Sequence, residues 1–211
     1  PLDIDPDYLS INVICEGEAQ NLWLGTYGAG VIHLDLKTDQ WKRYHRDLPT
    51  GTGLSSNQVR ALHVAKDGIV WIGTWGGGLN RLDSKTDTIK YIKSSLNNDQ
   101  TLSSNNISAI YSTNENSLWI GTNKGLNQYD PISGQFKRYL HQPTQHNSLS
   151  NNMVNTIFRD RKGRLWVGTR YGLNCLLETQ DRFLRYFFYS EQHSNSNTFK
   201  SIFEDRSGVL W

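Results

Sequence analysis

Short runs of apolar residues alternate along the whole chain with polar, glycine-containing segments. In the second of the groups that they form, the runs are Val59 to Val64, the stretch around Val70-Trp71-Ile72, Leu79 to Leu82 and Ile89 to Ile92. Runs of this length, rich in β-branched and aromatic residues and bounded by turn formers, indicate short strands rather than helices. The pattern therefore predicts an all-β fold made of four-stranded units.

The strands belong to an internal repeat that is marked by one pentapeptide. Its copies are LWLGT at Leu22 to Thr26, VWIGT at Val70 to Thr74, LWIGT at Leu118 to Thr122 and LWVGT at Leu165 to Thr169. A fifth Leu-Trp pair ends the sequence, and the tryptophans at positions 23, 71, 119, 166 and 211 are separated by 48, 48, 47 and 45 residues. This period is typical of the blades of a β-propeller.

The repeat predicts one partial β-propeller over residues 1–211, made of antiparallel four-stranded blades. The blades are expected at about 9–46, 57–93, 105–140 and 152–189, with an incomplete blade at 197–211. Such a count of about four and a third blades cannot close a ring. We therefore expect an open arc of a larger propeller, for which seven blades is the favoured number.

Two sets of repeated residues are interpreted as structural. The first set is the tryptophans Trp23, Trp71, Trp119, Trp166 and Trp211, which we expect to wedge between blades with the indole N–H bonded to a backbone group. A ring of tryptophans that binds a ligand is the alternative. The second set is Asn57, Asn105 and Asn152, whose short amides suit the turn before each first strand.

Charged residues recur near the strands that come third and fourth in each repeat. Aspartates 35, 83 and 130 stand at one repeated position, where they are expected to cap a turn. Lysines and arginines on the last strand are interpreted as guards of an exposed sheet edge, against the alternative of a basic rim for an anionic polymer.

Candidate ligand contacts lie on the connections that propellers gather at one mouth of their channel. The connection after each pentapeptide is variable between constant flanks, which is typical of function carried on a rigid scaffold. The ligand-contact set that we predict consists of Tyr27, Trp75, Asn123, Lys124, Arg170 and Tyr171, together with the polar residues Asn12, Arg60, Ser108, Asn155 and Lys200 on the first strands. Aromatic faces beside amide and guanidinium groups suit an oligosaccharide or a similar polar ligand. Ordinary exposed loops around a water-lined channel are the alternative.

Composition and charge exclude several other classes. Alanine occurs five times, whereas asparagine, serine and threonine together occur 53 times, so that a helical bundle is excluded. The 22 Lys and Arg residues balance 20 Asp and Glu residues without a like-charge block, which argues against nucleic acid as a partner of this region. Cys15 and Cys175 form neither a disulfide framework nor a metal motif, and no metal or cofactor is expected. No signal peptide or transmembrane segment is visible in these residues.

No catalytic constellation is visible in the sequence. The six histidines show neither HExxH nor nucleophile-base spacing, and GxSxG and phosphate-loop motifs are absent. The sialidase-type aspartate box is absent as well. The catalytic set is therefore predicted to be empty, although a propeller hydrolase or lyase whose carboxylates lie on other blades stays an alternative.

The second repeat resembles the two-component regulator propeller repeat in its segments LSSNQV, the DG turn, VWIGT, GGGLNRLD and IKYI. The resemblance covers almost the whole chain. It implies seven-bladed propellers, often two in tandem, in the periplasmic or extracellular part of an inner-membrane sensor. It further implies a downstream β-sandwich, a transmembrane helix and a signalling domain elsewhere in the same polypeptide.

The resemblance implies the function of a ligand-sensing region in a bacterial hybrid two-component histidine kinase of the phosphorelay type. The expected partners are a small polar ligand, such as an oligosaccharide, the remaining blades and signalling domains of the same chain, and a second copy in a homodimer. Three alternatives stay open, namely the sensor region of a diguanylate cyclase, a secreted propeller hydrolase or lyase, and a scaffold propeller that binds only protein.

Overall fold

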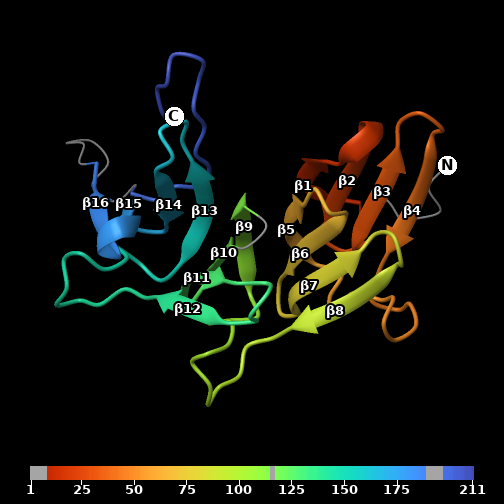
Figure 1. Cartoon of the computed structure of the whole chain (residues 1–211), viewed down its shortest axis with the longest axis horizontal. Helices are drawn as coiled ribbons and strands as arrows, with labels where there is room; N and C mark the ends of the chain where they lie inside the picture. Colours follow the sequence, from red (N-terminus) through yellow and green to blue (C-terminus); the bar gives the residue numbers. More distant parts are fainter. Residues whose placement is uncertain (1–8, 115–116, 189–196) are drawn as a thin grey trace. The chain divides into compact units, whose positions relative to one another are not determined.

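In the computed structural model, which describes residues 9–114, 117–188 and 197–211, the chain folds into consecutive four-stranded sheets (Figure 1). The first sheet contains β1 (Ile11–Glu16), β2 (Asn21–Thr26), β3 (Val31–Asp35) and β4 (Gln40–Tyr44), and the second β5 (Val59–Val64), β6 (Ile69–Thr74), β7 (Gly78–Asp83) and β8 (Thr88–Ile92). The third contains β9 (Ile107–Asn114), β10 (Ser117–Thr122), β11 (Gly125–Tyr129) and β12 (Phe136–Tyr139), and the fourth β13 (Val154–Arg159), β14 (Leu165–Thr169), β15 (Leu173–Leu177) and β16 (Arg182–Tyr186). Within the described residues, the single-turn 3₁₀ helices η2 (Glu18–Gln20) and η3 (Glu178–Gln180) interrupt the connections.

In each sheet the strands lie side by side in chain order, and the two middle strands pair antiparallel, namely β2 with β3, β6 with β7, β10 with β11 and β14 with β15. This is the meander of a propeller blade. The predicted all-β propeller built from four-stranded blades is confirmed, and within the described residues no strand pairing joins one sheet to another to close a ring. In the second blade β5 covers the predicted residues Val59–Val64, and β6, β7 and β8 contain the other three predicted runs. No helix in the described part of the chain is long and apolar enough to span a membrane.

The chain divides into two compact units within β9. The first unit extends to Ser94 and includes Asn105–Ile110, and the second contains Ser95–Ser104 and the residues from Tyr111 onward. The first unit therefore contains the first two blades and the start of β9, and the second unit contains the rest of the third blade and the fourth blade.

The middle strands are apolar because both of their faces are covered. All six residues of β6 are buried, whereas on β8 only Ile89 is. In the first unit, one core contains the tryptophan of β2, Trp23, together with Val59 and Leu62 of β5 and Ile72 of β6. Burial of these side chains stabilises the blade pair by roughly 25 cal/mol for each Å² of apolar surface that is removed from water.

The repeated tryptophans are buried except the last. Trp23, Trp71, Trp119 and Trp166 have exposed fractions of 3%, 5%, 2% and 6%, whereas Trp211 is 75% exposed. The expectation that a backbone group accepts the indole N–H is wrong for the last two. The indole Nε1 of Trp166 donates to Oδ2 of Asp160 at 2.9 Å, and that of Trp211 donates to Oδ2 of Asp205 at 3.0 Å. A carboxylate stands at this position only in these two repeats.

Two arginines of the outer strands are hydrogen-bonded rather than free. On β12, Arg138 donates from Nε to the carbonyl of Thr101 at 2.8 Å, and on β16 Arg185 donates from Nε to the carbonyl of Ser148 at 2.7 Å. Each guanidinium holds the loop that leads into its own blade. These two arginines therefore hold loops of their own blades, and the interpretation of the outer-strand cations as edge guards stays a prediction.

The aspartates at the start of the turn between the last two strands act as the sequence predicts. Oδ1 of Asp35, Asp83 and Asp130 accepts the backbone N–H two residues later, at 2.8, 3.0 and 2.8 Å. These hydrogen bonds lower the pKa of Asp35 and of Asp130, where the bond from Ser133 is the largest cause, because they favour the ionised carboxylate.

Candidate functional site

The connection between the second and third strands of each blade is closed by the threonine of the pentapeptide. In the second blade Oγ1 of Thr74 donates to the carbonyl of Gly78 at 2.8 Å, and Gly78 has φ +82°. Only glycine adopts this conformation without strain. The threonine–glycine bond recurs in the other blades at 2.8 to 2.9 Å for Thr26 with Gly30, Thr122 with Gly125 and Thr169 with Gly172.

The segment before each first strand connects two such turns. In the first unit, the N–H of Gly30 in the first blade donates to the carbonyl of Asn57 at 3.2 Å, and the N–H of Trp75 in the second blade donates to the carbonyl of Gln58 at 2.8 Å. The side chain of Asn57 adds a third bond, since its Oδ1 accepts the N–H of Arg46 at 2.7 Å. The dipeptide Asn57-Gln58 therefore places the turns of both blades side by side.

The consequence is a cluster of Tyr27, Arg60 and Trp75, which we call the aromatic–arginine cluster. The guanidinium carbon of Arg60 lies 5.2 Å from the centre of the Tyr27 ring and 5.7 Å from that of the Trp75 ring. These distances are those of cation–π contacts. Tyr27 and Trp75 nevertheless remain 48% and 40% exposed, so a ligand can still reach their rings.

Arg60 keeps its hydrogen-bonding capacity for a ligand. It is exposed, and among the described residues no hydrogen bond or ion pair to its side chain is found. A guanidinium offers five N–H donors in a planar fork, and stacking on aromatic faces leaves those donors at its edge available. The aromatic–arginine cluster can therefore donate hydrogen bonds to a polar ligand while its rings contact C–H groups.

In the second unit, Asn152 and Met153 hold the two turns that contain the other predicted contacts. The N–H of Gly125 donates to the carbonyl of Asn152 at 2.7 Å, and the N–H of Arg170 donates to that of Met153 at 2.9 Å. Beside these turns Asn123 is half-buried and Lys124 is exposed. Oδ1 of Asn123 is buried without a hydrogen-bond partner in the described structure.

Arg170 and Tyr171 do not form a second copy of the aromatic–arginine cluster. Nη1 of Arg170 lies 3.7 Å from Sδ of Met153, and the ring of Tyr171 lies 5.4 Å from that of Phe187. Tyr171 is 45% exposed. Ligand contact by these residues stays a prediction.

The polar residues predicted on the first strands fall into two groups. Nδ2 of Asn12 donates to the carbonyl of Val59 at 3.0 Å, and Nδ2 of Asn155 donates to that of Phe199 at 3.1 Å. The amide of Asn12 therefore joins β1 to β5, and that of Asn155 joins β13 to the segment at Phe199, which is not a strand. Arg60 and Lys200 are exposed and Ser108 is half-buried, so the structure brings only Arg60 of this set to the aromatic rings.

The asparagines that precede the first strands use their side chains in backbone hydrogen bonds. Oδ1 of Asn105 accepts the N–H of Ser94 at 2.8 Å, and Oδ1 of Asn152 accepts that of His141 at 2.7 Å, as Asn57 does with Arg46. Asn197, which the sequence analysis did not single out, makes the same bond with Phe188 at 2.7 Å.

A second set of asparagines, on the third strands, was missed by the sequence analysis. Asn174 is fully buried, accepts the N–H of Ser150 at 2.8 Å and donates to the carbonyl of Val167 at 3.0 Å. Asn80 and Asn127 make the equivalent bonds. The signal was present in the recurring Gly-Leu-Asn of GLNRLD and GLNQYD, with Leu173-Asn174 in the fourth copy.

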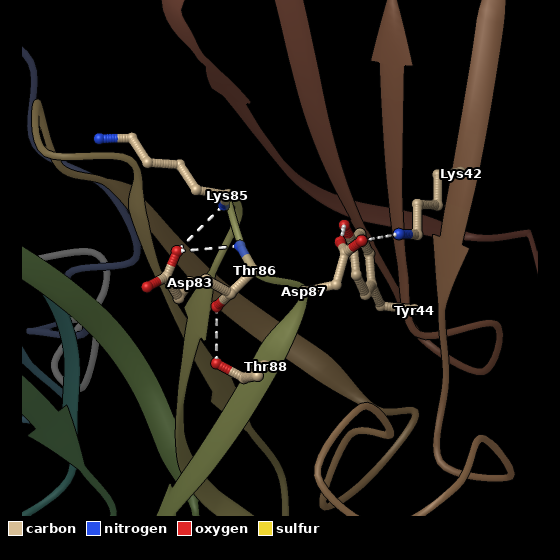
Figure 2. A network of polar contacts seen from close by, with 7 residues as sticks. All are labelled: Lys42, Tyr44, Asp83, Lys85, Thr86, Asp87 and Thr88. Atoms are coloured by element: carbon tan, nitrogen blue, oxygen red, sulfur yellow. Dashed lines mark hydrogen bonds and ion pairs between the residues drawn. The ribbon is translucent and has the colours of Figure 1, made fainter.

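Lys42 and Tyr44 of β4 bind Asp87 in the last turn of the second blade (Figure 2). The Tyr44 hydroxyl donates to Oδ1 of Asp87 at 2.7 Å, and Nζ of Lys42 lies 2.5 Å from Oδ2. We call this arrangement the Lys-x-Tyr–Asp clamp. Asp87 has φ +56°, so its side chain is presented from a left-handed turn position.

The second unit contains the same clamp. The Tyr139 hydroxyl donates to Oδ1 of Asp181 at 2.9 Å, Nζ of Lys137 lies 2.6 Å from Oδ2, and φ of Asp181 is +54°. The lysine contact, followed by the tyrosine bond, lowers the pKa of Asp87. Burial, together with the aspartate, raises the pKa of Tyr44 and of Tyr139.

An open cavity of about 410 Å³ surrounds the clamp of the second unit. It is lined by Trp119, Lys137 and Asp181 and by the pair Arg159 and Glu178. Its charges are already paired, since Nη1 of Arg159 lies 3.6 Å from Oε1 of Glu178. Among the described residues no group of three or more His, Cys, Asp or Glu side chains could hold a metal ion.

Comparison with known protein families agrees with the resemblance that the repeated sequence shows. The family model described as two component regulator propeller matches residues 53–76, 101–124 and 148–171. Each match runs from the residues before a first strand to the turn after the pentapeptide. No curated protein matches the chain.

Solved structures with a similar fold include extracellular domains of bacterial proteins. The extracellular domains of two putative hybrid two component systems from B. thetaiotaomicron match with TM-scores of 0.75 and 0.62 at 22% and 17% identity, over 96% and 97% of this chain. PorZ, a surface component of the type-IX secretion system of Porphyromonas gingivalis, matches with a TM-score of 0.70 at 18% identity over 95% of this chain. The chain spans only 26%, 38% and 30% of these proteins. The family match identifies the repeats that contain residues 53–76, 101–124 and 148–171 as two-component regulator propeller repeats.

Proposed function

We propose that the chain is part of the extracytoplasmic sensor region of a membrane-bound bacterial hybrid two-component histidine kinase. In this role it binds a polar ligand, such as an oligosaccharide, at the aromatic–arginine cluster. The repeat family and the similarity to extracellular domains of hybrid two component systems support the sensor role. The cluster of Tyr27, Arg60 and Trp75 supports the position of the site.

The proposal rests on the contact of two exposed aromatic rings with the Arg60 guanidinium, to which no hydrogen bond or ion pair is found within the described residues. The three residues come from two blades, and the turns of both blades are fixed by backbone bonds to Asn57-Gln58. A site that is held in this way is preorganised, which lowers the entropic cost of binding. Rings beside hydrogen-bond donors suit a sugar, because its C–H face stacks while its hydroxyl groups accept.

A sensor also needs two signalling states with different affinity for the ligand. A site built from two blades meets this need, because a change in the blade-to-blade packing alters the distance between Tyr27 and Trp75. The signalling domain and the pairing into homodimers stay proposals that rest on the family resemblance.

The test is calorimetric titration of the natural polypeptide that contains this chain with a panel of oligosaccharides. Trp75→Ala and Arg60→Ala are each expected to weaken the binding of an active saccharide about tenfold, which corresponds to roughly 1.4 kcal/mol. Trp41→Ala is the matched control, because Trp41 is also 40% exposed in the first unit but lies on β4. Equal affinity of all three variants and the wild type, or no saccharide that binds, would contradict the proposal.

A further inference from the structure

Two apolar positions of the first strand are exposed in the first blade and buried in the second blade. Ile11 and Ile14 of β1 are 49% and 61% exposed. Their counterparts on β5, Val59 and Leu62, are 0% and 7% exposed. The same sequence pattern therefore produces an apolar face that is covered in one blade and open in the other.

The structure shows what covers such a face. A Cβ added to Gly25 of β2 would lie 2.6 Å from Cγ1 of Val59, so the two sheets approach closely at the glycine of the pentapeptide. Asn12 of β1 then donates to the carbonyl of Val59 at 3.0 Å. The cover of a first strand is therefore the preceding blade, which contributes a glycine and a polar side chain.

The turn between the last two strands of the first blade contains the aspartate of a Lys-x-Tyr–Asp clamp without its lysine and tyrosine. Asp39 has φ +55° and occupies the turn position of Asp87 and Asp181, whose φ values are +56° and +54°. Those two aspartates each bind a lysine and a tyrosine. Asp39 is exposed, and no hydrogen bond or ion pair to it is found within the described residues.

Along the sequence, the aspartate is present where the preceding outer strand ends in tyrosine. Tyr44 precedes Asp87 by 43 residues, and Tyr139 precedes Asp181 by 42 residues. In the repeat where Ile92 takes the place of the tyrosine, Gly134 takes the place of the next aspartate. The two clamp positions therefore change together, and an aspartate at position 39 implies a tyrosine before it.

We infer that the face formed by Ile11, Ile14 and Asp39 docks a further repeat of the same polypeptide, on its N-terminal side, whose outer strand carries a Lys-x-Tyr pair. The lysine and the tyrosine of that strand bind the two carboxylate oxygens of Asp39. The glycine of its pentapeptide lies against Ile11, as Gly25 lies against Val59. The spacing of the two existing clamps places its tyrosine about one repeat before Asp39.

A second copy of the chain is a poorer occupant of this face. Within the described blades, the lysines of both complete Lys-x-Tyr pairs already bind Asp87 and Asp181. The outer strand of the fourth blade offers Tyr186, but Leu184 stands where the lysine is required. It therefore lacks the positive charge that would complement Asp39.

The test measures how far position 14 is shielded from solvent in the natural polypeptide. Cysteine is introduced as Ile14→Cys or, as the control, Ile132→Cys, and maleimide labelling is quantified at each site by peptide mass spectrometry. Ile132 is 77% exposed in a turn of the third blade. We expect at least tenfold slower labelling at position 14 than at position 132, with no dependence on protein concentration. Adding Asp39→Asn is expected to accelerate labelling at position 14 severalfold, whereas adding Asp99→Asn, at another exposed aspartate, leaves it unchanged.

Each other outcome overturns the inference. Equal labelling of both sites shows that nothing covers the face. Protection that disappears on hundredfold dilution assigns the face to a second copy. An upstream sequence without a repeat that carries Lys-x-Tyr removes the occupant, and labelling at position 14 that is unaffected by Asp39→Asn removes the clamp.

Discussion

Asp87→Asn isolates the charge of the Lys-x-Tyr–Asp clamp. Asparagine has the size of aspartate and tolerates the left-handed conformation that φ +56° requires. Its carbonyl oxygen can still accept the Tyr44 hydroxyl, so the change removes the ion pair with Lys42 and the charged character of the tyrosine bond. The backbone of the turn stays as it is.

The expected cost follows from the exposure of each partner. The side chains of Lys42 and Asp87 are 49% and 44% exposed, which limits their ion pair to about 0.2–1 kcal/mol. Tyr44 is only 3% exposed, and a hydrogen bond to a charged group contributes about 1 kcal/mol more than a neutral one. We therefore expect Asp87→Asn to destabilise the contact between the first two blades by about 1–2 kcal/mol.

The effect depends on pH in a defined direction. The pKa of Asp87 in the folded chain lies below its ordinary value of 3.8, so its contribution to stability is present above that pH and disappears as the pH falls through the lowered pKa. The pKa of Tyr44 is raised above its ordinary value of 10.0, so the tyrosine contribution is present below pH 10 and is lost as the pH rises through the raised pKa. The difference between variant and wild type is thus expected to be constant at neutral pH and to vanish in acid.

Hydrogen exchange of the amides in β4 and β8 is the assay, because the two units need not unfold together. A loss of 1–2 kcal/mol accelerates exchange about 5- to 30-fold. Asp83→Asn is the control, since it removes the same charge from the same turn, where the described part of the chain donates to the Asp83 side chain only from the backbone of Lys85 and Thr86 (Figure 2). Exchange in Asp87→Asn that is no faster than in Asp83→Asn would refute the argument.

Three further substitutions test the packing of the blades. Gly25→Ala places a Cβ 2.6 Å from Cγ1 of Val59 and is expected to cost about 1–3 kcal/mol, measured as faster hydrogen exchange in β1 and β5. Asn174→Ala removes three hydrogen bonds of a fully buried amide and should cost about 2–4 kcal/mol, with the loss seen in urea denaturation of the second unit. Asp160→Asn weakens the hydrogen bond from the Trp166 indole. Burial of Asp160 raises its pKa, but its hydrogen bonds outweigh burial, so the pKa of Asp160 is lowered. The destabilisation, about 2 kcal/mol, should therefore be present at neutral pH and disappear on acidification below the ordinary aspartate pKa, which acid titration of tryptophan fluorescence would detect.

The candidate site was predicted in part. The variable turns after the pentapeptide identified Tyr27 and Trp75, and the polar position on the first strands identified Arg60. What the sequence could not show is that Asn12 and Asn155, at the same position as Arg60, bind backbone carbonyls of the next repeat, at Val59 and Phe199. A short amide reaches the neighbouring backbone, whereas the longer guanidinium extends to the rings.

The sequence by itself determined the blade. The period of the tryptophans, the apolar runs and the glycines with positive φ are local properties of the chain, and they require no knowledge of distant contacts. For the same reason the turn-capping aspartates at positions 35, 83 and 130 could be predicted, because each bonds to a backbone N–H two residues away.

Only the tertiary structure decided which side chains meet across blades. The clamp joins Lys42 and Tyr44 to Asp87 across more than 40 residues, and Arg60 meets a ring from each of two blades. These partners are set by how neighbouring sheets stack, and the sequence of one repeat does not show which side chains of the neighbouring blade it will contact. Lys42 and Lys137 therefore looked like solvent-facing charges in the sequence, whereas stacking places an aspartate from the next blade against each of them.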